Sequence, residues 1–559
     1  MNKLYVLSEK TRIYRVLSAA VLTFMTVFML AFGSRQSYGF DELFSIGMIH
    51  EKSVIEVCKL MVDDSCPPLF TLLLSLFYRV MPYGETYLLI LPILFTVGGV
   101  IALGKAGKAI GGEDLGFFAV CVAATSSILI TQGGWEIRAY SSLFCFSSMT
   151  LLYYVRRLKE ESNKNILLYG ISLALLLYSH YFGSILALFY GLVDLCLWLR
   201  KKIAFKCILS YVWAGICFVP WFIFMFAYHT SDLSFFWVSP PNIMAPVETI
   251  AYLLSNSIIY CLLFSVGFLA LLFKELQKIK RKNGDDVFDI WRYLMGSIAW
   301  LILSVWCYSK FLHPSGGFYL NRYFFVILPH VFLITAYAVC TICRVPWFNQ
   351  NASRKFLLCI SVFALFFVTG YKNYSKILSP ENSVTFREVA EYLNDKNLLN
   401  DSLLLSTLPE KVVSGWITYY FDKRGYKLPL NIVHRSNGMI ASNYRIYNPH
   451  ELYVGYSDGK KTIDFQYQGY GYDYMNLDES QFLTEDRLLH YKKIYLFDQE
   501  GILSNEFLNL IEKTYVLEET FSRSPSERWS FNQKMKALLG FGSTQPDRSL
   551  ERGLRIYTK

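Results

Sequence analysis

The first two thirds of the sequence consist of long apolar runs separated by short polar loops. Most of these runs come close to the ~20 consecutive apolar residues that a helix needs to cross a bilayer. Their length and low charge predict membrane-spanning helices at residues 16–33, 86–104, 115–131, 139–155, 165–181, 182–199, 204–227, 248–273, 291–311, 323–343 and 356–371. The pattern therefore predicts an all-α polytopic membrane domain with about eleven transmembrane helices.

One further apolar stretch, Pro68–Met81, is short for a span and decides the orientation of everything that follows. Lys and Arg concentrate in cytoplasmic loops. If the N-terminus is cytoplasmic and this stretch does not cross, 23 Lys and Arg residues fall in cytoplasmic loops. The external loops up to residue 322, without the short stretch itself, then hold only five. If it crossed, 19 of the 23 would lie outside. We therefore predict a multi-pass plasma-membrane protein with a cytoplasmic N-terminus.

The composition changes near residue 372, where Asp, Glu, Asn and Lys become frequent and no further span is visible. Strand-like runs then alternate with helical patterns. The strand-like runs are Ser402–Ser406 and Ile494–Phe497, and the helical patterns are Thr385–Leu393 and Glu506–Thr514. We predict two domains, which are a transmembrane domain at 1–371 with an outer-face loop at 34–82, and a C-terminal extracytoplasmic α/β domain at 372–559.

The composition supports a membrane protein and excludes several other classes. Apolar residues make up 53% of the chain and charged residues only 18%, whereas charged residues are about a quarter of a soluble domain. A disordered chain, a collagen and a disulfide-stapled secreted module are excluded. The net charge of +10 follows from the predicted cytoplasmic loops, so no nucleic-acid partner is expected.

Ionisable residues that persist beside a membrane are candidates for function. In the predicted topology a scattered set lies at the outer rim, namely Asp41, Glu42, Asp64, Glu136, Arg138, His180, Arg322 and Tyr323. Each has a structural alternative, such as a solvated acidic loop, a loop-closing ion pair, an interfacial histidine or a lipid-phosphate anchor. Together they would supply a base, metal or hydroxyl contacts, and a cradle for an anion.

The order of these segments resembles the polyprenyl-phosphate-sugar-dependent type C glycosyltransferases, a group that includes protein O-mannosyltransferases, lipid A aminoarabinose transferases and RgtA/B/C/D-like bacterial enzymes. The matching elements are Asp41–Glu42, the Asp-x-x-Pro-Pro-Leu segment at Asp64, the Glu-x-Arg-x-Tyr loop (Glu136, Arg138, Tyr140), the helix end with Tyr178, His180 and Tyr181, Pro220–Trp221, and Arg322–Tyr323 with Leu328–Pro329. The family's first loop holds two juxtamembrane helices, which fits 43–61 and 68–81. One departure is Cys66, where the family usually has His before the Pro-Pro pair.

The resemblance implies an integral membrane glycosyltransferase that moves a sugar from a polyprenyl-phosphate donor to an acceptor hydroxyl at the outer face of the membrane. It implies Asp41 as the general base, with inversion at the anomeric carbon. Glu42 would position the acceptor or bind a divalent cation, and Glu136 with His180 would complete a metal site or hold sugar hydroxyls. A metal requirement stays open. Mg or Mn would suit the oxygen ligands, with Asp41, Glu136 and His180 as the candidate set.

The carrier phosphate is expected to bind Arg138 and Arg322, because a guanidinium group holds phosphate oxygens through two parallel hydrogen bonds. The other candidates for substrate contacts are Asp64, Tyr140, His180 and Tyr323. The expected partners are a polyprenyl-phosphate-linked sugar donor, a glycan, lipid or protein acceptor, and membrane lipids.

Two other functions stay open. A flippase or transporter of lipid-linked sugars would use the rim charges as a gate, although transporter sites favour the bilayer midplane. A non-catalytic glycan-binding membrane protein would use the spans as an anchor. Turnover separates the three functions, since an enzyme transfers a labelled sugar, a flippase relocates it and a binder does neither.

Overall fold

The computed structural model describes most of the helical part of the chain and selected stretches of the C-terminal part. The described residues are 2–33, 37–50, 52–62, 64, 66–82, 84–228, 240–280, 290–312, 318–345, 352–378, 385–395, 402–409, 412, 416, 419–420, 431–435, 443–447, 455–457, 460–462, 475–478, 492–498, 505–522 and 553–559.

By its internal contacts the chain divides into two compact units. The first comprises Met1–Arg35 and Val54–Ser379, and the second comprises Gln36–Ser53 and Pro380–Lys559. The second unit therefore combines the C-terminal part of the chain with a short segment of the predicted outer-face loop. Nothing in the sequence pattern indicated this association.

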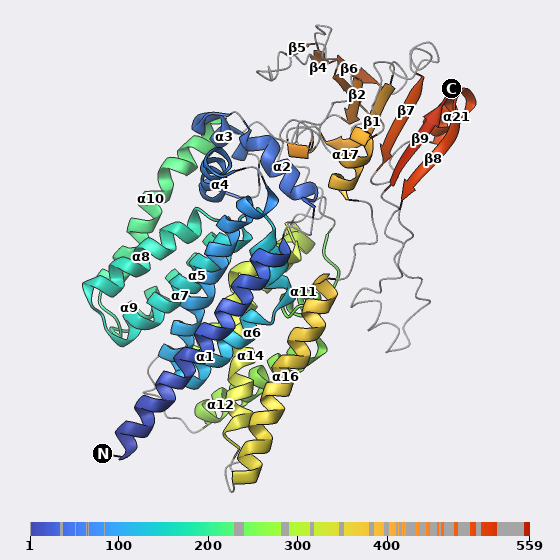
Figure 1. Cartoon of the computed structure of the whole chain (residues 1–559). Helices are drawn as coiled ribbons and strands as arrows, with labels where there is room; N and C mark the ends of the chain where they lie inside the picture. The colour runs from blue at the N-terminus through green and yellow to red at the C-terminus, as the bar shows by residue number, and fades with distance from the viewer. Residues whose placement is uncertain are drawn as a thin grey trace. The chain divides into compact units, whose positions relative to one another are not determined.

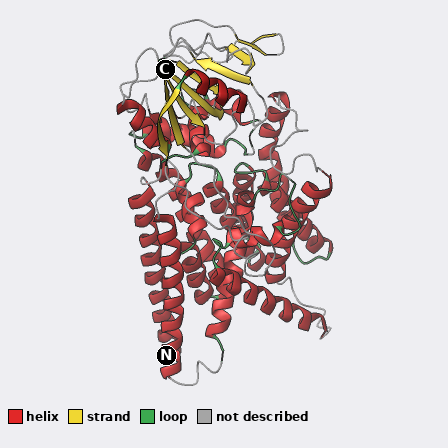
Figure 2. Ribbon diagram, turned by 90° about the vertical axis from the view of Figure 1, so that its right-hand side faces the viewer, coloured by secondary structure: helices red, strands yellow, loops and turns green. Residues whose placement is uncertain are grey.

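The first unit is helical, as Figures 1 and 2 show. Each of the eleven apolar runs coincides with one helix or with two consecutive ones. In chain order the unit holds α1 (Asn2–Phe32), α3 (Val54–Met61), α4 (Leu69–Val80), α5 (Glu85–Gly111), α6 (Glu113–Ala124), η2 (Leu129–Trp135), α7 (Tyr140–Lys159), α8 (Asn163–Leu177), α9 (Phe182–Leu199), α10 (Lys206–Tyr228), α11 (Ala245–Leu253), α12 (Ile258–Lys280), α13 (Ile290–Cys307), η3 (Tyr308–Leu312), η4 (Asn321–Ile327), α14 (Leu328–Cys343) and α16 (Ala352–Leu378).

Within the described residues, seven helices are long and apolar enough to cross a membrane. The bent pair α6 and η2, whose two parts differ in direction by 76°, makes an eighth if it is one span. The three remaining runs correspond to α7 with 20 residues, α8 with 15 and α16 with 27, which are not among these candidates. The chain is thus a mostly helical, multi-pass membrane protein, and the number of eleven spans stays a prediction.

The described residues of the predicted outer-face loop form three short helices rather than the two expected. The predicted helix at 43–61 is divided, since α2 (Phe40–Ile49) ends before α3 begins at Val54. Helix α4 has 12 residues, about half the length of a span, which agrees with the prediction that Pro68–Met81 does not cross.

Glycines allow α5 to pack closely against α6 and α7. A Cβ atom added to Gly116 of α6 would lie 2.7 Å from the carbonyl oxygen of Gly104, and one added to Gly99 would lie 3.0 Å from the Cα atom of Cys145. Such close approach is typical of membrane helices, whose association depends on van der Waals packing rather than on the hydrophobic effect. Larger side chains at Gly99 and Gly116 would force these helices apart.

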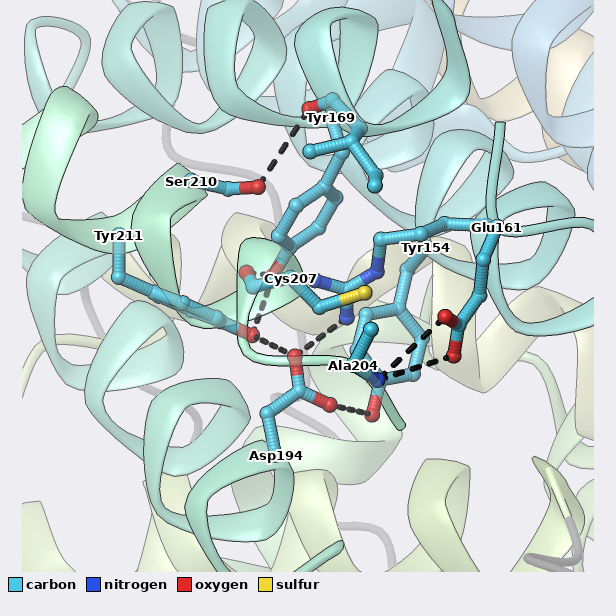
Figure 3. A network of polar contacts seen from close by, with 10 residues as sticks. Tyr154, Glu161, Tyr169, Asp194, Ala204, Cys207, Ser210 and Tyr211 are labelled. Atoms are coloured by element: carbon cyan, nitrogen blue, oxygen red, sulfur yellow. Dashed lines mark hydrogen bonds and ion pairs between the residues drawn. The ribbon is translucent and has the colours of Figure 1, made fainter. Parts of the chain in front are cut away.

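A buried ion pair near the C-terminal end of α7 is part of a network that links four helices (Figure 3). Arg157 of α7 donates to Asp194 of α9, and both side chains are 0% exposed. Tyr154 and Tyr211 also donate to the Asp194 carboxylate, at 2.9 and 2.7 Å, and Arg157 Nη1 donates to the carbonyl oxygen of Cys207 at 3.2 Å. The Tyr211 hydroxyl in turn accepts from Tyr169 of α8 at 2.8 Å, so α7, α8, α9 and α10 are all linked.

The second unit contains a mixed sheet. Its described strands are β1 (Ser402–Pro409), β2 (Asn431–Arg435), β3 (Asn443–Tyr447), β4 (Gly455–Ser457), β5 (Lys460–Thr462), β6 (Met475–Asp478), β7 (Lys493–Asp498), β8 (Val516–Ser522) and β9 (Gly553–Thr558), and its described helices are α2, α17 (Phe386–Asp395) and α21 (Asn505–Thr514). Seven strands follow the order β6-β3-β2-β1-β7-β9-β8, and β4 pairs with β5. Strand β1 is parallel to β2 and β7, whereas the other pairs are antiparallel. Both strand-like runs and both helical patterns predicted for this part are present, as β1, β7, α17 and α21.

The ion pair yields a stability prediction. Asp194→Ala leaves Arg157 charged and buried without its carboxylate, which is expected to lower the free energy of unfolding by about 3–5 kcal/mol. The double variant Arg157→Leu with Asp194→Leu removes both charges and should be markedly more stable than the single variant. Heating in detergent, followed by gel filtration of the surviving protein, measures the change.

The exposed pair between Lys108 and Glu113 is the control, because its side chains are 44% and 23% exposed. Glu113→Gln should change stability by less than about 1 kcal/mol. A double variant as unstable as Asp194→Ala would contradict the prediction.

Candidate functional site

Five of the predicted site residues gather in the first unit, at the ends of helices. Arg138 lies between η2 and α7, and Tyr140 is the first residue of α7. His180 lies in the turn between α8 and α9, and Arg322 and Tyr323 belong to the 3₁₀ turn η4. Helix ends place side chains at the limits of the apolar bundle, where polar groups are less costly than in its middle.

The turn η2 is held tightly against α1, which positions the Glu136–Arg138 loop that follows it. Trp135 Nε1 donates to the carbonyl oxygen of Met29 at 2.9 Å. A Cβ atom on Gly134 would lie only 2.4 Å from the Met29 sulfur. A larger residue at position 134 would therefore displace the loop that carries Arg138.

Aromatic and guanidinium groups form a compact cluster around Tyr140. The ring of His180 lies 6.4 Å from that of Tyr140 and 4.8 Å from that of Tyr323, centroid to centroid. The Arg322 guanidinium lies 5.9 Å from the centroid of the Tyr140 ring. Arg138 is within electrostatic reach of both Tyr140 and His180. The structure thus brings together side chains that are separated by up to about 180 residues in the sequence.

Asp64 adjoins the same cluster through Arg138. Its Oδ2 atom lies 3.7 Å from Arg138 Nη1, and the two side chains are 12% and 10% exposed. Cys66, which stands where the resembling family usually has His, is buried and within electrostatic reach of the Tyr140 hydroxyl. Two residues of the segment with the Pro-Pro pair, Asp64 and Cys66, therefore adjoin the cluster.

His180 is held as a neutral hydrogen-bond donor. Burial lowers its pKa to about 3, and the charges of Arg138 and Arg322 act in the same direction. Its Nδ1 atom accepts from the backbone N–H of Phe182 at 3.2 Å, which assigns the proton of the neutral ring to Nε2. That Nε2 atom is buried and has no hydrogen-bond partner among the described residues.

The Tyr140 hydroxyl is also buried without a hydrogen-bond partner in the described part of the chain. Buried polar groups are rarely left unpaired, and an exception needs an explanation such as a missing ligand. The cluster offers an N–H group, a hydroxyl and two guanidinium groups, all of which can donate. This arrangement suits an oxygen-rich anion.

Glu136 lies beside this cluster and is half-buried. Glu136 and Arg322 both act electrostatically on Tyr252 of α11, and Gln132 hydrogen-bonds to the same tyrosine. Tyr252 and Gln132 were not predicted as site residues from the sequence. Gln132 was detectable as a polar residue directly after an apolar run, whereas Tyr252 looks like an ordinary aromatic residue of a span.

Asp41 and Glu42 belong to the second unit, in the first turn of α2. Glu42 forms a capping interaction, because its Oε2 atom accepts from the backbone N–H of Gly39 at 3.0 Å. Both carboxylates are half-buried, and the first turn of a helix favours negative charge. Glu42 thus has a structural function, and the catalytic roles predicted for the pair stay predictions.

The predicted metal set of Asp41, Glu136 and His180 also stays a prediction. Among the described residues, no three His, Cys, Asp or Glu side chains are grouped to hold a metal ion. A metal needs the lone pair of a ring nitrogen, but on His180 the lone pair of Nδ1 already accepts a hydrogen bond and Nε2 carries the proton. The two nearby guanidinium groups add a positive field, so His180 does not fit the role of a cation ligand.

No protein-family model and no curated protein matches the sequence. Solved structures do resemble the fold. The protein O-mannosyltransferase Pmt1-Pmt2 complex of S. cerevisiae bound to the sugar donor is 18% identical with a TM-score of 0.31, over 40% of this chain and 35% of that chain. ArnT from Cupriavidus metallidurans bound to undecaprenyl phosphate is 11% identical with a TM-score of 0.44, over 80% and 97%. The Archaeoglobus fulgidus oligosaccharyltransferase in the apo form is 10% identical with a TM-score of 0.40, over 72% and 63%.

The chain spans about a third of the O-mannosyltransferase chain that it matches.

The buried His180 makes stability depend on pH. The unfolded chain protonates this residue near pH 6.5, whereas the folded chain does so only near pH 3. Between these values the unfolded state binds one more proton, so the free energy of unfolding falls as the pH falls. From pH 7 to pH 5 the loss assigned to His180 is about 2 kcal/mol.

His180→Gln removes this protonation site. Between pH 7 and pH 5 the free energy of unfolding of the variant should therefore fall by about 2 kcal/mol less than that of the wild type, whatever its stability at pH 7. Thermal unfolding in detergent at both pH values gives the two slopes. Equal slopes for the wild type and the variant would show that His180 is not held neutral.

Proposed function

We propose that this protein is a glycosyltransferase that moves a sugar from a polyprenyl-phosphate donor to an acceptor hydroxyl at the outer face of the membrane. The observation that carries the proposal is the cluster of Arg138 and Arg322 with the buried hydrogen-bonding groups of Tyr140 and His180. The cluster lies at the ends of membrane helices, where the phosphate of a lipid-linked sugar would be found.

The cluster suits a phosphate that leaves the sugar. As the bond to the anomeric carbon breaks, negative charge grows on the phosphate oxygens, and fixed donors aimed at them lower the barrier. Arg138 and Arg322 supply charge, while Tyr140 and neutral His180 supply donors that need no change of protonation between pH 5 and 8. The leaving phosphate therefore needs no general acid among these residues.

Activation of the acceptor falls to an acidic residue in this proposal. Asp41 would take the proton of the acceptor hydroxyl, as the resemblance implies, and one direct displacement would invert the anomeric carbon. Glu42 would support Asp41 by capping the helix on which both lie. The sugar and the acceptor, whether glycan, lipid or protein, are left to experiment.

The phosphate role of the arginines is testable by binding alone. Arg138→Gln should weaken binding of radiolabelled undecaprenyl phosphate by about ten- to a hundredfold, because a charge-assisted hydrogen bond contributes ~1.5–3 kcal/mol. Arg292→Gln is the matched control, since Arg292 is 60% exposed and pairs with Glu275 away from the cluster. Unchanged affinity in Arg138→Gln would remove Arg138 from the donor site.

The base is tested by turnover. Purified protein would be incubated with radiolabelled undecaprenyl-phosphate hexoses and crude outer-face acceptors, and Asp41→Asn should reduce the rate by about 10²–10⁴ without weakening donor binding. Glu518→Gln, which alters an exposed ion pair of the same unit, should keep the wild-type rate. Wild-type turnover in Asp41→Asn would refute the assignment of the base.

The purified protein and the labelled donor also distinguish the proposed transferase from the two alternative functions. Movement of intact labelled donor between the leaflets of a vesicle, without transfer, would indicate a flippase. Tight binding with neither transfer nor movement would indicate a non-catalytic binder.

A further inference from the structure

The segment that precedes Asp41 is bound by residues from the C-terminal part of the chain. The backbone N–H of Tyr38 donates to the Tyr420 hydroxyl at 2.9 Å, and the Ser37 hydroxyl lies 3.0 Å from the same oxygen. The backbone N–H of Arg387 donates to the Ser37 hydroxyl at 3.1 Å. We call Ser37, Tyr38, Arg387 and Tyr420 the clamp. All four belong to the second unit.

In one assignment of the clamp's protons, Tyr420 accepts from the Tyr38 N–H and donates its own hydroxyl proton to Ser37 Oγ. Ser37 then accepts from both Tyr420 and Arg387, and its proton goes to the carbonyl oxygen of Tyr38 at 3.2 Å. Each donor of the clamp thus meets an acceptor, which makes the arrangement mutually supporting.

Helix α17 gains a capped first turn from this contact. The first N–H groups of a helix have no partner within the helix. Thr385 and Glu388 satisfy each other's N–H groups through their side chains, at 3.3 and 2.9 Å, and Ser37 takes the N–H of Arg387 between them. Ser37 therefore completes the start of a helix that lies 350 residues away in the sequence.

Tyr420 is a rigid anchor because of what surrounds it. Its side chain is 0% exposed. Four residues earlier, Trp416 packs against Phe497 of β7 at 5.3 Å and donates its Nε1–H to the carbonyl oxygen of Phe386 at 2.9 Å. The adjacent Tyr419 ring meets the Tyr38 ring edge to face at 4.9 Å. Among the described residues near Tyr420, Trp416 thus packs against the sheet and Tyr419 against Tyr38.

We propose that Tyr420 is a positioning residue, which fixes the start of α2 and with it the direction of the Asp41 carboxylate. Only Gly39 and Phe40 lie between the clamped Tyr38 and Asp41, and Gly39 is itself held by the Glu42 carboxylate. Three residues span at most ~10 Å, so little freedom remains for Asp41 once Tyr38 is held. The catalytic part of this inference rests on the proposed function, whereas the anchoring part does not.

The anchoring part is tested without any substrate. Tyr420→Phe keeps the ring but removes the oxygen that accepts the Tyr38 N–H. Hydrogen–deuterium exchange of the peptide that contains Tyr38 should become about tenfold faster at that amide. Tyr419→Phe is the matched control, because the contact of Tyr419 with Tyr38 is made by the ring, and it should exchange like the wild type. Wild-type protection in Tyr420→Phe would overturn the inference.

The kinetic test measures whether the hydrogen bond of Tyr420 to Tyr38 affects the rate of sugar transfer. If Asp41 is misdirected, Tyr420→Phe should lower kcat about tenfold while the KM for the donor stays within about twofold of wild type. Ser37→Ala should act in the same direction, and Tyr419→Phe should keep the wild-type kcat. A wild-type kcat in Tyr420→Phe, together with faster exchange at Tyr38, would show an anchor without a positioning role.

The two kinds of failure are distinguishable. If the wild-type protein transfers no sugar, the proposed function fails, and the exchange experiment still decides whether Tyr420 holds the acidic segment. If the wild type transfers and only the effects of Tyr420→Phe are absent, the positioning role fails and the proposed function stands.

Discussion

A charged pair with no access to water, Arg157 with Asp194, sets the geometry of the helical unit. Isolated charges in an apolar interior are strongly unfavourable, so each partner is confined to the one arrangement that pairs it. The pair joins α7 to α9, and these helices carry Tyr140 and His180 at or next to their opposite ends. From Arg157 to Tyr140 the rise along α7 is roughly 25 Å. The pair thus fixes the relative positions of the two helices that carry or adjoin Tyr140 and His180, although it does not itself belong to the candidate site.

At the other end of that frame, the site is rich in hydrogen-bond donors and poor in acceptors. Arg138, Arg322, Tyr140 and the N–H of His180 all favour an anion, and Asp64 neutralises only part of the charge. Of the other acidic residues predicted for the site, Asp41 and Glu42 lie on α2 in the second unit, and Glu136 lies beside the cluster. The proposed function therefore assigns binding of negative charge to residues of the first unit and removal of the acceptor proton to a residue of the second.

Much of this was visible in the sequence, for identifiable reasons. Apolar runs of 16 to 26 residues each coincided with helical structure, since the length of a span is set by the bilayer. Polar residues at the ends of those runs marked Arg138, His180 and Arg322. Arg157, by contrast, was counted among the loop charges, although the structure buries it against Asp194. The association of Ser37 with Tyr420 left no trace, because it depends on packing between segments with no shared pattern.

The contact of Ser37 with α17 also constrains how the protein is made. The two partners of that contact are separated by 350 residues, so the ribosome completes the loop long before its partner exists. At about 5–20 residues per second, the interval is roughly 20 to 70 seconds. During that time the segment with Ser37 and Asp41 lacks its contact with α17, while the later helices are synthesised. The contact between Ser37 and α17 can therefore form only after Arg387 has been synthesised, which places it late in biosynthesis.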